Sequence, residues 1–227
     1  MSEVAGRSDG AGAVQPRAVL FDWDNTLVDT WPTIHEAINA TLTAFGFDAW
    51  TYEETRQRAR RSLRDSFPPI FGERWKEARK LFYDRFAAIH LEGLRPHPGA
   101  QEMLGQFKDA GLYLGIVSNK NGAYLRAEVA HLAWDGYFER VVGALDADQD
   151  KPDPAPVEMA LAGSGIQCGA EVWFAGDTEV DLECAHNAGC VPVLVRAEAP
   201  KPREFGPFEP VWHVEDCLAL CKLIGRL

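Results

Sequence analysis

The sequence has no apolar run that approaches the roughly 20 residues needed to cross a membrane as a helix. Residues 1–17 also lack the apolar segment of a secretory signal peptide, so we expect a cytoplasmic protein that does not act on a membrane. Residues 1–16 are rich in Gly, Ala and Ser, which bury little surface, and this composition predicts a flexible N-terminal tail.

Cysteine pairs with the spacing of a zinc site are missing too. The five cysteines form an odd set without a CxxC pair, and none of the six histidines has metal-site spacing. Because a protein without a secretory signal meets reducing conditions, these features favour free, buried thiols over disulfides or zinc. The cysteines are Cys168, Cys184, Cys190, Cys217 and Cys221.

An excess of positive charge is absent as well. The net charge is −11, which argues against nucleic acid as a partner because phosphate backbones are bound by clustered Lys and Arg. The charge is uneven, however, since residues 51–95 contain 11 Lys and Arg against 7 Asp and Glu. This basic segment needs a local explanation.

Short apolar runs that end in polar clusters alternate with stretches of helical periodicity. The runs are rich in Val, Leu and aromatic residues, as expected for strands buried on both faces, and the alternation predicts a parallel α/β sheet. The expected strands are 18–21, 112–117, 141–142, 172–175 and 191–195, with 211–214 as an added edge. The expected crossover helices are 98–110, 122–132, 154–161 and 179–188.

A long insertion separates the first two predicted strands. It spans about 90 residues, far more than one crossover requires. Apolar residues recur in it at helical spacing, at Ile34, Ile38 and Leu42 and again at Phe82 and Phe86. We therefore expect a helical domain at 30–95, inserted into a core formed by 17–29 and 96–227.

Four groups of polar side chains follow the predicted strands or lie in adjoining loops. Each has an ordinary explanation when taken alone, because Asp, Asn and Ser favour turns and helix caps and a loop lysine is commonly solvated. Together they fall at one sheet edge, where α/β proteins bind ligands. Clustered carboxylates indicate a divalent cation, and a cation with Lys and Ser indicates a phosphoryl group. The residues are Asp22, Asp24, Ser118, Lys151, Asp177 and Asp181.

In order and spacing, these groups resemble the four motifs of the haloacid dehalogenase-like hydrolases. The match spans residues 18 to about 195. The insertion is similar to the helical cap of the branch that includes phosphoglycolate phosphatases and β-phosphoglucomutases. The resemblance implies a Rossmann-like, doubly wound parallel sheet as the core, with a small α-helical cap inserted after strand 1.

The resemblance also implies a phosphatase that hydrolyses a small phosphomonoester through an aspartyl phosphate. Asp22 would be the nucleophile, and Asp24 would be the general acid and base. Mg²⁺ would be held by Asp22, the Asp24 backbone carbonyl and Asp177, with Asp181 as a supporting partner of this set.

The phosphate oxygens would be bound by Ser118, the Asn119 backbone and Lys151. Trp23 and Asn25 stand where the family commonly has other residues. We expect the backbone amides there, rather than the side chains, to face the phosphate.

Other activities on the same core stay open. A dehalogenase would not need the second carboxylate, Asp24, because a halide leaves without a proton. A phosphonatase would need a cap lysine for a Schiff base, and the insertion offers Lys76 and Lys80. A phosphomutase would share all the core residues, whereas a non-enzymatic phosphate-binding protein would not need Asp22 and Asp24 intact.

The basic segment suggests a basis for substrate choice. An arginine fork binds a carboxylate through two hydrogen bonds, and Arg60 and Arg61 are our candidates for contacting an acidic leaving group such as that of phosphoglycolate. The alternative is a solvated helix face in which these arginines pair with neighbouring acids. The expected partner is a small phosphorylated metabolite, and the protein is expected to be a monomer or weak homodimer.

Overall fold

The computed structural model describes residues 14–59 and 66–225. The chain divides into two units, one formed by Met1–Val28 with Pro96–Leu227 and the other by Asp29–Arg95. We refer to them as the sheet unit and the helical unit. Residues 1–13 of the predicted tail lie outside the described residues.

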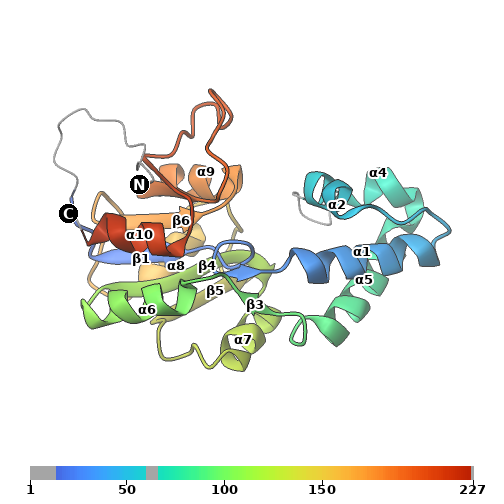
Figure 1. Cartoon of the computed structure of the whole chain (residues 1–227), viewed down its shortest axis with the longest axis horizontal. Coiled ribbons are helices and arrows are strands. Elements are labelled where there is room, and N and C mark those ends of the chain that lie inside the picture. The colour runs from blue at the N-terminus through green and yellow to red at the C-terminus, as the bar shows by residue number, and fades with distance from the viewer. Residues whose placement is uncertain (1–13, 60–65, 226–227) are drawn as a thin grey trace. The chain divides into compact units, whose positions relative to one another are not determined.

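The sheet unit is built on six strands in the order β5-β4-β1-β6-β7-β8, and every neighbouring pair is parallel. The expected parallel α/β sheet is thus confirmed (Figure 1). The first strand of the chain lies between β4 and β6, so the strand ends that carry the polar groups are neighbours in space. The strands are β1 (Ala18–Phe21), β4 (Tyr113–Asn121), β5 (Arg140–Ala144), β6 (Val172–Gly176), β7 (Val191–Val195) and β8 (Trp212–Val214).

In the described part of the sheet unit, five helices follow or connect these strands. They are α6 (Ala100–Asp109), α7 (Gly122–His131), α8 (Ala155–Leu161), α9 (Glu179–Asn187) and α10 (Cys217–Ile224). Because side chains of a strand alternate between faces, β1 contributes to the packing on both faces of the sheet. Leu20 joins the cluster that includes residues of α8 and α9, while the ring of Phe21 stacks on Phe107 of α6.

The helical unit contains α1 (Trp31–Ala44), α2 (Tyr52–Arg58), α4 (Pro68–Phe71), the short 3-10 helix Gly72–Arg74 and α5 (Trp75–Ile89). The apolar periodicity seen in the sequence is the buried stripe of its helices, because Ile38, Leu42, Phe82 and Phe86 are all buried. Where the chain enters and leaves this unit, β2 (Val28–Asp29) and β3 (Arg95–Pro96) form a two-stranded sheet.

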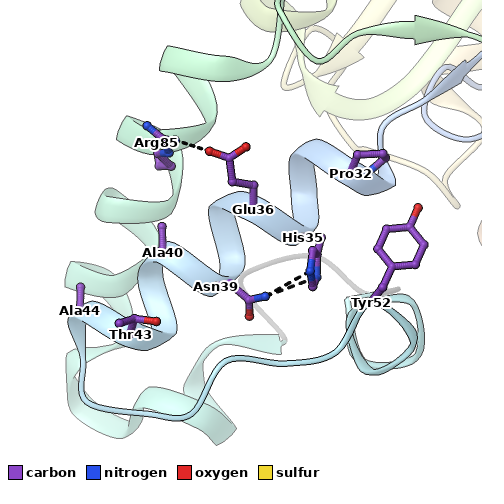
Figure 2. Close-up of a pocket in the computed structure, with 9 residues that line it drawn as sticks. All are labelled: Pro32, His35, Glu36, Asn39, Ala40, Thr43, Ala44, Tyr52 and Arg85. Atoms are coloured by element: carbon purple, nitrogen blue, oxygen red, sulfur yellow. Dashed lines mark hydrogen bonds and ion pairs between the residues drawn. The ribbon is translucent and has the colours of Figure 1, made fainter.

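A surface groove of about 1060 Å³ lies within the helical unit, lined mainly by α1 (Figure 2). Its polar groups are largely engaged by neighbours. Asn39 bonds to the backbone of Trp50 through both its amide nitrogen and its oxygen, and Glu36 pairs with Arg85. None of the residues predicted to carry chemistry lines this groove.

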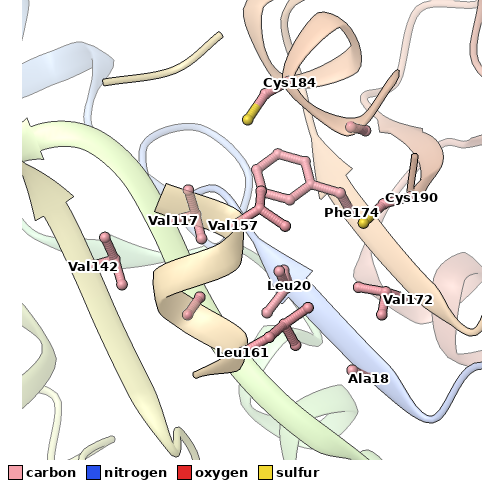
Figure 3. Packing of buried hydrophobic residues seen from close by; sticks show 12 residues of the cluster. Ala18, Leu20, Val117, Val142, Val157, Leu161, Val172, Phe174, Cys184 and Cys190 are labelled. Atoms are coloured by element: carbon pink, nitrogen blue, oxygen red, sulfur yellow. The ribbon is translucent and has the colours of Figure 1, made fainter. Parts of the chain in front are cut away.

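One hydrophobic cluster holds the centre of the sheet unit together (Figure 3). Ala18 and Leu20 of β1 and Val172 and Phe174 of β6 are fully buried in it. Two helices close over these strands, contributing Val157, Ala160 and Leu161 from α8 and Cys184 and Ala185 from α9. The strand ends therefore project from a well-packed support.

The end of β4 differs from the sequence-based expectation. β4 continues past Val117 to Asn121, which pairs with Ala144 after an irregularity in the ladder. This is possible because Gly143 lacks a side chain, since a Cβ there would lie 2.9 Å from the carbonyl oxygen of Lys120.

The expectation that all cysteines are buried is wrong for two of them. Cys184, Cys190 and Cys217 are buried, but Cys168 and Cys221 are only half-buried. All five are free thiols. Separately, none of the helices in 14–59 and 66–225 is both long enough and apolar enough to cross a membrane.

The role of the central cluster can be tested by truncating Leu20. We expect Leu20→Ala to lower the free energy of unfolding by about 2–5 kcal/mol, because it removes buried methyl groups and leaves a cavity. The same substitution at Leu145, which is 77% exposed, should change it by less than about 0.5 kcal/mol. Urea denaturation followed by circular dichroism measures both, and equal losses would contradict the assignment of Leu20 to the core.

Candidate active site

The carboxyl ends of three neighbouring strands converge at one edge of the sheet. Phe21, the last residue of β1, is in register with Ile116 of β4 and with Ala175 of β6. Asp22 therefore directly follows β1 at the level where the polar ends of its two neighbours begin. This register explains why residues 22, 118 and 177 lie at the same edge of the sheet although about 95 and 155 positions separate them in sequence.

Lys151 joins two of the predicted acids. Its ammonium nitrogen lies 2.8 Å from Oδ1 of Asp22 and 2.6 Å from Oδ1 of Asp181. Burial by itself would lower the pKa of Lys151, but the carboxylates of Asp181 and Asp22 outweigh it and raise the pKa above its usual value. The lysine is thus a fixed positive charge between two acids.

The backbone of Lys151 is fixed by Asn119. The Asn119 side chain accepts a hydrogen bond from the Lys151 N–H and donates one to its carbonyl, both at 2.9 Å. The next peptide bond, Lys151–Pro152, is cis. Because the Asn119 side chain is used in this way, only its backbone is left for the phosphate role predicted from the sequence.

Asp181 is held by the start of α9. Its Oδ2 accepts hydrogen bonds from the backbone N–H of Thr178 at 3.0 Å and from the Thr178 hydroxyl at 2.6 Å, so it closes a capping box. A Cβ on Gly176 would lie 2.3 Å from the Cβ of Asp181, so a glycine at position 176 gives the carboxylate its place. Asp181 therefore serves both Lys151 and the helix terminus.

Oxygen ligands for a divalent cation are available here. Carboxylate oxygens of Asp22, Asp177 and Asp181 lie within 4.8 Å of one another. Burial, opposed by Lys151, raises the pKa of Asp22 to about 6. Burial and then the charges of Asp181 and Asp22 raise the pKa of Asp177 well above its ordinary value. A cluster of hard oxygen donors that is short of positive charge fits Mg²⁺ or a similar ion.

Ser118 and Asp24 complete the predicted set within the sheet unit. Ser118 is buried, and its Oγ accepts from the N–H of Lys120 at 3.3 Å. The carboxylate of Asp24 does not belong to the acidic cluster of Asp22, Asp177 and Asp181. Its Oδ1 accepts a hydrogen bond from the Lys120 ammonium at 2.7 Å. The remaining candidates, Arg60 and Arg61, lie outside the described residues.

Sequence reasoning gave no role to three side chains that are linked to Asp24 in a chain of contacts, those of Lys120, Glu128 and Trp23. Lys120 pairs with Asp24 and with Glu128, and the indole N–H of Trp23 donates to Glu128 at 2.6 Å. The sequence carried one signal, since Lys120 directly follows the Ser118-Asn119 pair. Nothing in it indicated that Glu128, on a helix, is completely buried.

The fold and this cluster define an α/β protein with an acidic site bridged by a lysine. Residues 19–195 match the family described as haloacid dehalogenase-like hydrolase, and the chain belongs to that family.

Known relatives agree with this assignment. A phosphoglycolate phosphatase of Photorhabdus laumondii is 29% identical over 182 residues, which make up 77% of this chain and 77% of that protein. The crystal structure of a HAD-superfamily hydrolase from Ehrlichia chaffeensis has a TM-score of 0.64 at 29% identity, covering 94% of this chain and 98% of that one. That of a predicted phosphoglycolate phosphatase from Haemophilus somnus has the same fold, with a TM-score of 0.79 at 21% identity over 93% and 99% of the two chains. This chain is accordingly a hydrolase of the phosphatase type.

The raised pKa of Asp22 predicts a stability cost at neutral pH. The pKa of Asp22 in the folded state, about 6, is above its ordinary value of 3.8. Ionised Asp22 therefore destabilises the folded protein above pH 6, and this destabilisation disappears as the pH falls to about 4. Asp22→Asn should therefore raise the free energy of unfolding of the chelator-treated protein by about 1–3 kcal/mol at pH 7.5 and by almost nothing at pH 4. Urea denaturation at several pH values measures this difference.

The control is Asp135→Asn, a matched change at an exposed aspartate, which should leave the pH dependence unchanged. A destabilised Asp22→Asn protein at pH 7.5, or a difference that does not vary with pH, would contradict this account of the site.

Proposed function

We propose that this chain is a magnesium-dependent phosphatase that hydrolyses small phosphomonoesters through an aspartyl phosphate on Asp22. The observation that carries the proposal is the contact of Lys151 with Asp22 inside an acidic cluster. This contact fixes the orientation of a buried carboxylate. It also places a positive charge where the acids of the cluster would otherwise repel the oxygens of a phosphate.

In the first displacement a carboxylate oxygen of Asp22 attacks phosphorus, and the bond from phosphorus to the substrate oxygen breaks. Asp24 donates its proton to that oxygen, so the product leaves as an alcohol. Lys151, Ser118 and the backbone N–H of Asn119 neutralise the charge on the remaining phosphate oxygens, which is the main form of catalysis in phosphoryl transfer.

In the second displacement a water molecule attacks the phosphorus of the aspartyl phosphate. Asp24, now a carboxylate, accepts the proton from that water, and the bond to Asp22 breaks. Inorganic phosphate leaves, and both aspartates return to their starting states. One residue therefore serves as acid and then as base, which requires that its carboxylate stay beside the phosphorus in both steps.

The residues that would hold Mg²⁺ are Asp22, Asp177 and the backbone carbonyl of Asp24, with Asp181 supporting them through Lys151. The ion would supply positive charge that offsets the repulsion between an anionic nucleophile and an anionic phosphate. The choice of Mg²⁺ over other cations rests on the hard, all-oxygen ligand set.

For the substrate we propose a small acidic phosphomonoester of the 2-phosphoglycolate type. Support comes from relatives that bear the name phosphoglycolate phosphatase and from the basic composition of residues 51–95. We further propose that the partner is a small cytoplasmic metabolite rather than nucleic acid or a membrane. The protein would act as a monomer or weak homodimer.

The reaction itself can be tested by phosphate release. We expect the wild type with Mg²⁺ to release phosphate from p-nitrophenyl phosphate and from members of a panel of small phosphomonoesters that includes 2-phosphoglycolate. Removal of divalent ions with a chelator should abolish release. Asp22→Asn should lower kcat by at least about 10³-fold, because the amide is not a nucleophile.

Asp135→Asn, the same change at an exposed position, is expected to retain full activity. An active Asp22→Asn enzyme would rule out the proposed nucleophile. A wild type inactive on the whole panel would favour the phosphomutase or phosphonatase alternatives, which share these core residues.

The arginine hypothesis has its own test. Arg60→Ala or Arg61→Ala should raise KM for 2-phosphoglycolate by about tenfold or more, because a two-bond contact with the substrate carboxylate is lost. KM for p-nitrophenyl phosphate, which has no such carboxylate, should stay the same. Arg79→Ala is the control within the helical unit, and unchanged kinetics on both substrates would leave the arginines as a solvated face.

A further inference from the structure

A fully buried carboxylate lies next to the site without belonging to the acidic cluster. Glu128 of α7 is 0% exposed. Burying a charge is costly unless it is paired and hydrogen-bonded. Its Oε2 accepts hydrogen bonds from the Trp23 indole at 2.6 Å and pairs with the Lys120 ammonium at 2.7 Å, so two donors from other elements satisfy it.

The same lysine also forms an ion pair with Asp24. Lys120 Nζ lies 2.7 Å from Asp24 Oδ1, and the side chain of Lys120 is only 6% exposed, whereas that of Asp24 is 27% exposed. The chain of contacts thus runs from the buried Glu128 through Lys120 to Asp24, whose carboxylate solvent and ligands can reach. Its members come from the end of β1, the extension of β4 and helix α7.

The two lysines of the site separate four carboxylates into two pairs. Lys151 binds Asp22 and Asp181, whereas Lys120 binds Asp24 and Glu128. Lys120 is nearly inaccessible and already has two carboxylate partners, so it is poorly suited to bind a phosphate itself. A contact that uses Oδ1 of Asp24 leaves Oδ2 for proton transfer.

We propose that Lys120, anchored by Glu128 and Trp23, is a positioning residue that holds the Asp24 carboxylate where it exchanges a proton with the leaving oxygen. This role rests on the proposed function. Lys120 itself gains and loses no proton: the proton moves from Asp24 to the substrate oxygen as the phosphorus–oxygen bond breaks. Without the lysine, Asp24 loses its fixed orientation but Asp22 and Lys151 keep theirs.

The test compares two leaving groups. An alkyl phosphate such as 2-phosphoglycolate needs a proton on its leaving oxygen, whereas p-nitrophenolate leaves with little assistance. The ratio kcat/KM reports the first displacement. We expect Lys120→Met to lower kcat/KM for 2-phosphoglycolate on the order of 10²–10³-fold, through kcat rather than KM, and for p-nitrophenyl phosphate less than tenfold.

A double-mutant cycle ties the effect to Asp24. In an Asp24→Asn background, Lys120→Met should cause no further loss on 2-phosphoglycolate, because the group it positions is gone. Lys222→Met, an exposed lysine of α10, is the matched control and should leave both substrates unaffected. If Lys120→Met does not fold because Glu128 loses its partner, Lys120→Met with Glu128→Gln removes the unpaired charge and should show the same selectivity.

The outcomes are distinguishable. A leaving-group-selective loss that vanishes in the Asp24→Asn background supports the role. Equal losses on both substrates, or a loss that persists without Asp24, overturn it while leaving the phosphatase proposal intact. A wild type that releases no phosphate from any substrate overturns the proposed function and this role together.

Discussion

The site depends on an electrostatic constraint: three carboxylates, two of them buried and one half-buried, lie close together, and one lysine cannot neutralise all of them. Lys151 contacts Asp22 and Asp181 directly, and Asp177 lies within the same cluster. Burial and mutual repulsion raise the pKa values of Asp22 and Asp177, so these acids resist ionising without more positive charge nearby. The repulsion among these carboxylates destabilises the protein, and a bound cation would relieve it. Catalytic sites commonly sacrifice stability in this way.

The scaffold keeps this arrangement from relaxing. Asn119 fixes the backbone of Lys151 through two hydrogen bonds, and Thr178 fixes Asp181 through two more. Both attachments come from ends of strands or helices in the same unit. Because the strands beneath are packed in a continuous core, the charged groups cannot drift apart to lower their repulsion.

The sequence predicted most of the sheet because its strands are buried on both faces and appear as uninterrupted apolar runs, such as Val172 to Ala175. The acids could be found because each follows such a run. Glu128 could not, because it lies on a helix without a clear apolar face, and its partner Trp23 is 105 positions away. The two half-buried cysteines were misjudged for a similar reason, since burial is decided by tertiary neighbours rather than by residue type.

The absence of a side chain at Gly176 also determines the geometry of the site. This residue ends β6, and a residue with a Cβ at this position would collide with Asp181. A larger residue at position 176 would therefore disturb the contact of Asp181 with Lys151 even though every aspartate and lysine of the site is kept. The geometry of the charged groups thus depends on an uncharged residue as well, since Asp181 occupies the space that the missing side chain of Gly176 leaves.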